Sequence, residues 1–152
     1  MAKITIKNID TIKRRLHSYS RIDLTDKMNK ATTLVHGQAK SLAPVDTGNL
    51  AGSIHMEVKS KGRNIIGRVF TNVEYAPFVE FGTGIKGNGS YPYEVKGLNL
   101  TYRDTPWVYS PDGGDTFYHT EGQIAQPYMY PSLHDNKDII KKMFAEEIKK
   151  KG

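Results

Sequence analysis

The residues whose types and spacing most suggest catalysis are Asp46, Thr47 and Gly48, which follow one another directly in the chain. Aspartic proteases carry this triplet and pair two such aspartates, so that one shared proton lets them act as acid and base. A second stretch, residues 64–68, resembles a segment of the retroviral proteases. One hypothesis is therefore an aspartic protease with Asp46 as its catalytic residue.

The context of the triplet favours a simpler interpretation. A helical pattern and Pro44 precede it, whereas the protease triplet follows apolar residues and lies between strands. The interval from residue 46 to residue 64 is also too short for the flap hairpin and strands that separate the two motifs in proteases. Asp46 and Thr47 can instead bond nearby backbone amides, while Gly48 takes a positive φ. We therefore expect a turn, with the protease as a remote alternative.

No other constellation predicts catalysis or a metal site. The chain has no cysteine, which removes thiolate nucleophiles and cysteine-ligated metals. Its 5 histidines show no metal-ligand spacing, and the segment from Asp112 to Asp115 lacks the later acidic ligands of a calcium loop. No serine lies in a G-x-S-x-G turn, and no phosphate-binding G-x-x-x-x-G-K-[ST] loop is present. We expect a protein that is not an enzyme and that binds no cofactor and no metal.

Aromatic residues crowd a glycine-rich region between residues 84 and 122. They could stack nucleic-acid bases, but only Lys86, Lys96 and Arg103 supply positive charge there. Contact with another protein is a better interpretation than nucleic-acid binding, because tyrosine and tryptophan are enriched in interface cores. A small local core of the region itself is an equally open alternative. The interface candidates are Tyr91, Tyr93, Tyr102, Trp107, Tyr109 and Tyr118.

The size and charge of the chain set further limits. Its 152 residues suit one domain, and no apolar run approaches the roughly 20 residues that cross a bilayer. The N-terminus does not resemble a secretory signal. The net charge of +6 is concentrated in the first third of the chain, which leaves a small basic DNA-binding protein as a second hypothesis. Steep salt-dependent binding that needs Arg14, Arg15 and Arg21 would support it.

The apolar periodicity predicts helices at both ends and hairpins between them. The clearest helix carries Leu24, Met28, Ala31, Val35, Ala39 and Leu42 as one stripe, and Pro44 ends it. The other predicted elements are a strand over 3–7, a helix from residue 8 or 10, a hairpin over 54–71, a short helix over 75–81, strands over 95–102, 107–109 and 116–118, and a helix from residue 131 or 135.

This order predicts an α+β fold in a single domain over residues 1–152. The long N-terminal helix packs on an antiparallel sheet, and a C-terminal helix completes the body. Residues 85–122 form a long Gly/Tyr-rich insertion, either an extended β-hairpin or a loop.

Three sequence blocks, in order, resemble the small tail-component family of long-tailed bacteriophages, whose members are described as head–tail joining, neck or tail-completion proteins. The first block covers 43–50 and continues to Ile54, the second covers 72–83, and the third covers 126–133. The motif residues are Pro44, Val45, Asp46, Thr47, Gly48, Leu50, Tyr75, Ala76, Glu80, Gly82, Thr83, Gln126 and Pro127.

The resemblance implies a structural virion protein that acts in head–tail joining or tail completion by ring assembly at the neck or tail end. Its partners would be further copies of itself and neighbouring neck or tail proteins, without a membrane or specific nucleic-acid binding. It would be made in the cytoplasm of the host bacterium. Ala51 departs from the basic residue expected there, and the insertion over 85–124 is longer than in shorter relatives.

Each block also has a physical interpretation in assembly. Pro44 fixes the end of the long helix, and the turn after it aims the hairpin. Gly82 ends the short helix, which would leave Glu80 free to pair with a basic neighbour. Gln126 and Pro127 hold an extended segment that lays aromatic residues against the sheet. We expect the 85–122 segment to supply one face of the contact between subunits in a ring.

Overall fold

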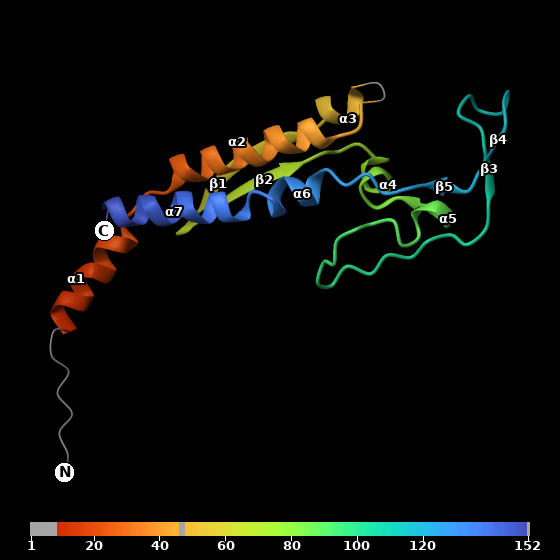
Figure 1. Ribbon diagram of the computed structural model, residues 1–152. Helices are drawn as coiled ribbons and strands as arrows, with labels where there is room; N and C mark the ends of the chain where they lie inside the picture. Colours follow the sequence, from red (N-terminus) through yellow and green to blue (C-terminus); the bar gives the residue numbers. More distant parts are fainter. Residues whose placement is uncertain (1–8, 46–47, 152) are drawn as a thin grey trace, which may run out of the picture.

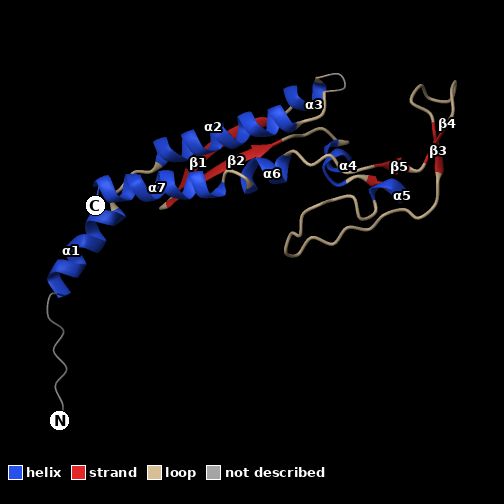
Figure 2. Ribbon diagram, in the orientation of Figure 1, coloured by secondary structure: helices blue, strands red, loops and turns tan. Residues whose placement is uncertain are grey.

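A computed structural model describes residues 9–45 and 48–151. The molecule is long and narrow, with the first helix at one end and a small hairpin at the other (Figure 1). The predicted strand over 3–7 and the residues Asp46 and Thr47 lie outside the described residues. The described part mixes helices with two small antiparallel sheets, so the predicted α+β class is confirmed (Figure 2).

Helix α2 (Thr25–Leu42) is the predicted long helix and packs on a hairpin. Near its start, the Thr25 amide donates to Asp23 Oδ1 at 2.8 Å. The helix ends where Ala43 adopts an extended conformation, with ψ 131°. That conformation is the one a residue before proline favours, so Pro44 ends the helix as predicted. The helix buries Ala31, Thr32, Val35 and Ala39.

The hairpin under α2 consists of β1 (His55–Lys61) and β2 (Asn64–Phe70), paired from His55 opposite Phe70 to Lys61 opposite Asn64. A two-residue turn with Gly62 at φ 62° connects the strands. Gly67 of β2 lies against α2, and a Cβ there would overlap Thr32 Oγ1. Glycine at this position therefore sets the distance between the helix and the sheet.

A compact core forms at the end of α2. It joins Ala39 and Ala43 to residues of α3 (Asn49–Gly52), of α4 (Ala76–Phe81) and of the segment before α6. Tyr128 is 1% exposed and is the largest buried side chain. The buried members of this core are Ala39, Ala43, Leu50, Ile54, Ala76 and Tyr128.

The C-terminal region contains two helices, α6 (Met129–His134) and α7 (Lys137–Lys151), where the sequence predicted one. The helix is interrupted near Asn136, whose buried side-chain amide donates to the Ser132 carbonyl at 2.8 Å. Glu147 holds α7 against α2 through Lys27, at 3.3 Å. Helix α1 (Ile9–Ser20) extends beyond these helices (Figure 1).

The Gly/Tyr-rich region forms α5 (Gly84–Gly87) and three short strands, β3 (Trp107–Tyr109), β4 (Tyr118–Thr120) and β5 (Gly122–Gln123). Only β3 and β4 pair as a hairpin. The prediction of a strand over 95–102 is wrong, because this segment turns at Leu98 and pairs with no strand. The strand predicted over 116–118 begins at residue 118, because the Asp112 side chain accepts the Thr116 amide at 2.9 Å and extends the turn. No helix within 9–45 or 48–151 is long and apolar enough to span a membrane.

Candidate functional site

The second and third sequence blocks meet at the base of the Gly/Tyr-rich region. The Gln126 amide donates to the Val79 carbonyl at 2.8 Å, and Gln123 Nε2 donates to the Phe78 carbonyl at 2.9 Å. The two chain segments also form bridges at Thr83 opposite Gln123 and at the adjacent pair of glycines. The Gln123 amide also donates to the Thr83 hydroxyl at 3.2 Å, so segments 40 residues apart in sequence are joined by both backbone and side-chain hydrogen bonds.

Glu80 is the centre of this junction. Its side chain is buried, and its Oε2 accepts the backbone amides of Tyr128 at 2.8 Å and Met129 at 2.9 Å. Oε1 accepts the amide of Tyr130 at 3.1 Å. These amides belong to the first turn of α6 and the residue before it, where backbone donors have no partner within the helix. The prediction that Glu80 is free to pair with a basic neighbour is therefore wrong, because α6 occupies both of its oxygens.

Gly82 permits the close approach of the two segments. Its φ is 76°, and its amide donates to the Phe78 carbonyl at 3.0 Å, which ends α4 as the sequence predicted. A Cβ on Gly82 would lie 2.8 Å from the Ala125 amide nitrogen and from the Gln123 carbonyl. The glycine thus ends the helix and also leaves room for the segment that leads into the third block.

Two tyrosines near Glu80 carry raised pKa values. Burial, together with the negative charge of Glu80, raises the pKa of Tyr91 to about 12 and that of Tyr128 to about 12. The neutral phenols are thus favoured in the folded state. An unfolded tyrosine has a pKa near 10, so the stability from this effect is fully present below about pH 10 and is lost as the pH rises toward about 12.

We expect the wild-type protein to lose up to about 3 kcal/mol more stability than Tyr128→Phe between about pH 10 and pH 12. The reason is that phenylalanine keeps the buried ring but has no proton to release. Urea unfolding at several alkaline pH values measures the difference, with the exposed Tyr118→Phe as the matched control. Parallel stability curves for the wild type and Tyr128→Phe would contradict the prediction.

The first block lies against the same junction. A groove of ≈ 960 Å³ brings residues of all three blocks together with those of the hairpin region. Leu50 and Ala76 are buried in the core beside it, while Val45 is 86% exposed. Gly48 has φ 74°, as the turn interpretation predicted. The motif residues that line the groove are Pro44, Leu50, Tyr75, Gly82, Thr83 and Gln126.

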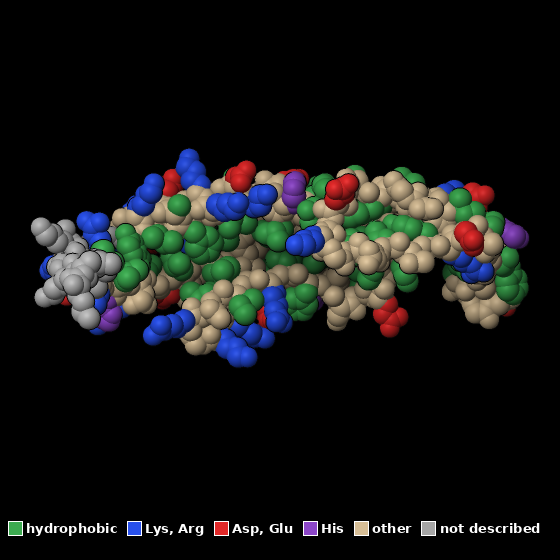
Figure 3. All heavy atoms as spheres, turned by 90° about the horizontal axis from the view of Figure 1, so that it is seen from below, with side chains coloured by type: hydrophobic (Ala, Val, Ile, Leu, Met, Phe, Trp, Pro, Cys, Tyr) green, Lys and Arg blue, Asp and Glu red, His purple; other side chains and the backbone are tan. Residues whose placement is uncertain are grey.

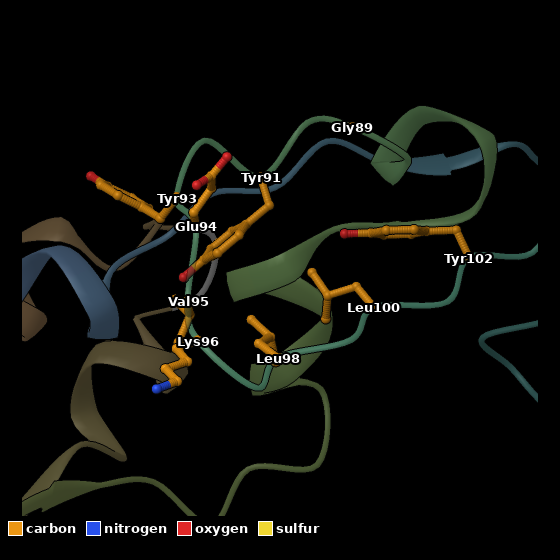
Figure 4. A pocket seen from close by; sticks show the side chains of 9 residues that line it. All are labelled: Gly89, Tyr91, Tyr93, Glu94, Val95, Lys96, Leu98, Leu100 and Tyr102. Atoms are coloured by element: carbon orange, nitrogen blue, oxygen red, sulfur yellow. The ribbon is translucent and has the colours of Figure 1, made fainter.

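Three of the six aromatic interface candidates pack inside the chain. The Tyr91 ring centroid lies 5.1 Å from that of Phe81 and 5.6 Å from that of Tyr93. The Tyr102 hydroxyl donates to the Phe81 carbonyl at 2.8 Å. In the pocket formed by 89–102, Leu98 and the neighbouring Leu100 point toward the space between the Tyr91 and Tyr102 rings (Figure 4). These aromatic side chains are half-buried and pack against one another within the chain.

The other candidates lie toward the end of the molecule. Trp107 is half-buried, with the Arg103 guanidinium 5.4 Å from its ring centroid. Tyr109 and Tyr118 face each other across the β3–β4 hairpin with ring centroids 5.7 Å apart, and each is 48% exposed. The intermolecular contact of these aromatic residues stays a prediction. In the ranges that the structure describes, no cluster of His, Asp or Glu side chains could hold a metal ion.

Residues 6–82 match a family model described as "Bacteriophage HK97-gp10, putative tail-component". The chain belongs to this family of phage tail components. No match was found among curated proteins or among solved structures. The matched part of this tail component includes α1 to α4 and the hairpin, and it ends at Gly82. It therefore contains the first block and the second block up to Gly82, including Glu80, but not the third block, whose backbone amides Glu80 binds.

Sequence reasoning missed some residues that build the junction of the tail component. Ser90 Oγ accepts the Ala125 amide at 2.8 Å and donates to the Gly87 carbonyl at 2.7 Å. This serine therefore links the segment after α5 to the segment that leads into the third block. Nothing in the local sequence marks this serine. Glu80 was recognised as a motif residue, but only a pairing of the second block with the third could have identified its partners.

Proposed function

We propose that this tail component is a structural virion protein that acts in head–tail joining or tail completion. It assembles into a ring at the neck or tail end, with further copies of itself and with neighbouring phage proteins as partners, and it catalyses no reaction. The host bacterial cytoplasm is where it is made, and the virion is where it acts. The observation that carries the proposal is the family match over residues 6–82.

The shape of the molecule supports assembly from unlike surfaces. Its two ends differ, because an amphipathic helix extends from one end and an exposed aromatic hairpin from the other (Figure 1). Rings require head-to-tail contacts in which one face of a subunit meets a different face of the next. An elongated subunit with different exposed apolar surfaces fits this requirement.

The test is deletion of the gene from the phage that carries it, followed by electron microscopy of the lysate. We expect filled heads and separate tails that fail to join, or tails of aberrant length. Supplying the wild-type protein from a plasmid should restore joined, infectious particles. Supplying Asp46→Asn should restore them equally, because no catalysis is required. Joined and infectious particles without the gene would contradict the proposal, and a failure of Asp46→Asn alone would favour the protease.

A further inference from the structure

The β3–β4 hairpin extends from the body as an arm, defined here as residues 104–121. Its two strands share only three residue pairs, and a hairpin of this size is marginally stable alone in water. Phe117 is 67% exposed, more than the other apolar residues of the arm. The exposed apolar side chains of the arm are Val108, Tyr109, Phe117 and Tyr118. Such a group of exposed apolar residues indicates an interaction surface.

The arm is acidic as well as aromatic. It contains four acidic residues and no lysine or arginine, although the chain as a whole has a net charge of +6. Glu121 lies at the base, 4.0 Å from Lys86 of the body. The other three carboxylates are exposed on the arm itself: Asp104, Asp112 and Asp115.

A second apolar surface lies on the body. A groove of ≈ 930 Å³, here called the α2–α7 groove, is lined by α2, β2, the 91–98 segment, α6 and α7. Its volume lies at the upper end of the roughly 300–1,000 Å³ typical of ligand pockets. The apolar residues that line it include Met28, Val35, Val69, Leu98, Leu133 and Phe144.

The exposed charges of this groove are positive. Arg68 and Lys137 line it and are exposed, and Arg68 also forms an ion pair with Glu57 at 3.5 Å. Glu80 also lines it, but both oxygens of this buried carboxylate already accept amides of the α6 start. Figure 3 shows hydrophobic side chains gathered along the face seen from below, with lysine and arginine side chains at its margins.

We propose that the α2–α7 groove of one copy receives the aromatic arm of a second copy. This inference rests on the proposed ring assembly and names the surfaces that meet. The apolar arm fits the apolar groove, and the arm's carboxylates complement Arg68 and Lys137 at the margin. The arm does not occupy the groove of its own chain, because no arm residue lines it and the arm lies at the far end of the molecule (Figure 1).

Disulfide cross-linking tests this contact, since the chain has no cysteine to interfere. Cysteines replace Phe117 on the arm and Leu133 in the groove, both exposed, in the full-length protein expressed during infection by the deletion phage. Purified particles are then oxidised and analysed on a non-reducing gel. We expect a ladder of covalent multimers at least tenfold stronger than from the control pair Phe117→Cys and Lys40→Cys. Lys40 is exposed on α2 but lies outside the groove.

Each outcome bears on a separate claim. A ladder supports the contact, and co-expression of the two single-cysteine variants should then give dimers only. Particles that contain the protein but yield monomer, or only an internally cross-linked chain, overturn the arm-in-groove contact and leave the proposed function intact. Purified particles that lack even the wild-type protein overturn both.

Charge-reversal substitutions provide a second test of the contact. Asp115→Lys and Lys137→Glu should each reduce the yield of joined particles at least tenfold, and the double variant should recover most of it. Glu146→Lys is the control, because Glu146 is exposed on α7 outside the groove. Equal losses in the single and double variants would count against the contact.

Discussion

Replacing Glu80 with alanine is expected to lower the free energy of unfolding by about 4 kcal/mol. The substitution removes the acceptor of three amide hydrogen bonds, to Tyr128, Met129 and Tyr130. Each lost bond to a charged acceptor is worth roughly 1.5–3 kcal/mol, offset in part when water reaches the amides. The start of α6 should loosen first, since Glu80 is the group that satisfies its donors. Urea unfolding, with hydrogen exchange at these three amides, measures both effects.

Two further variants separate this hydrogen-bonding role from a simple loss of bulk. Glu80→Gln keeps one acceptor oxygen and presents an NH2 group to the remaining amides, so it should lose roughly half as much stability. Glu74→Ala removes an exposed glutamate from the same sequence block and should change stability by less than about 0.5 kcal/mol. If Glu80→Ala unfolds at the same urea concentration as Glu74→Ala, the capping role is wrong.

Replacing Gly122 with alanine should lower the free energy of unfolding by about 3 kcal/mol and separate the two segments at the base of the arm. Gly122 has φ 94°, and a Cβ there would overlap the Thr83 carbonyl oxygen. The obstacle is backbone rather than a flexible side chain, so the two segments must separate. The Lys86 amide donates to the Glu121 carbonyl at 3.2 Å, and its hydrogen should then exchange with solvent faster.

Gly113→Ala is the matched control for this prediction. Gly113 also has a positive φ, 78°, but a Cβ there meets nothing within 4 Å. Gly113→Ala should therefore lower the free energy of unfolding only by the cost of the backbone conformation, about 1 kcal/mol. Thermal unfolding of both variants gives the difference. Equal melting temperatures for the two variants would mean that the close approach at Gly122 does not matter.

The elements that could be predicted from the sequence are those whose signals are local. The apolar stripe of α2, the extended residue before Pro44 and the two strands of the β1–β2 hairpin all depend on neighbouring residues. The end of α4 at Gly82 depends on one glycine. These elements make up most of the body, and the structure confirms them.

What could not be predicted depends on contacts between distant segments. Glu80 follows an ordinary helical pattern, and only the approach of residues 128–130 gives it three donors. The strand expected over 95–102 has the right residue types, but Tyr102 bonds to the Phe81 carbonyl instead of a partner strand. The break in the last helix depends on Asn136 bonding to Ser132, a pairing that periodicity does not reveal.

The candidate site was predicted in its parts but not in its geometry. All three sequence blocks were identified from their residues, and the structure brings Pro44, Tyr75 and Gln126 to one groove. The aromatic region divides into two parts that composition alone could not separate. Tyr91 packs within the chain, whereas Tyr109 remains exposed on the arm.

The most direct measurement of the central claim is the location of the protein in purified phage particles. An epitope tag at the C-terminus, labelled with gold and viewed by electron microscopy, reports this location, while mass spectrometry of the same particles reports the presence of the chain. We predict that the protein copurifies with joined particles and that the label is confined to the head–tail junction or the tail end. Absence of the protein from purified particles, with the chain found only in the soluble fraction of the lysate, would contradict a structural role in the virion.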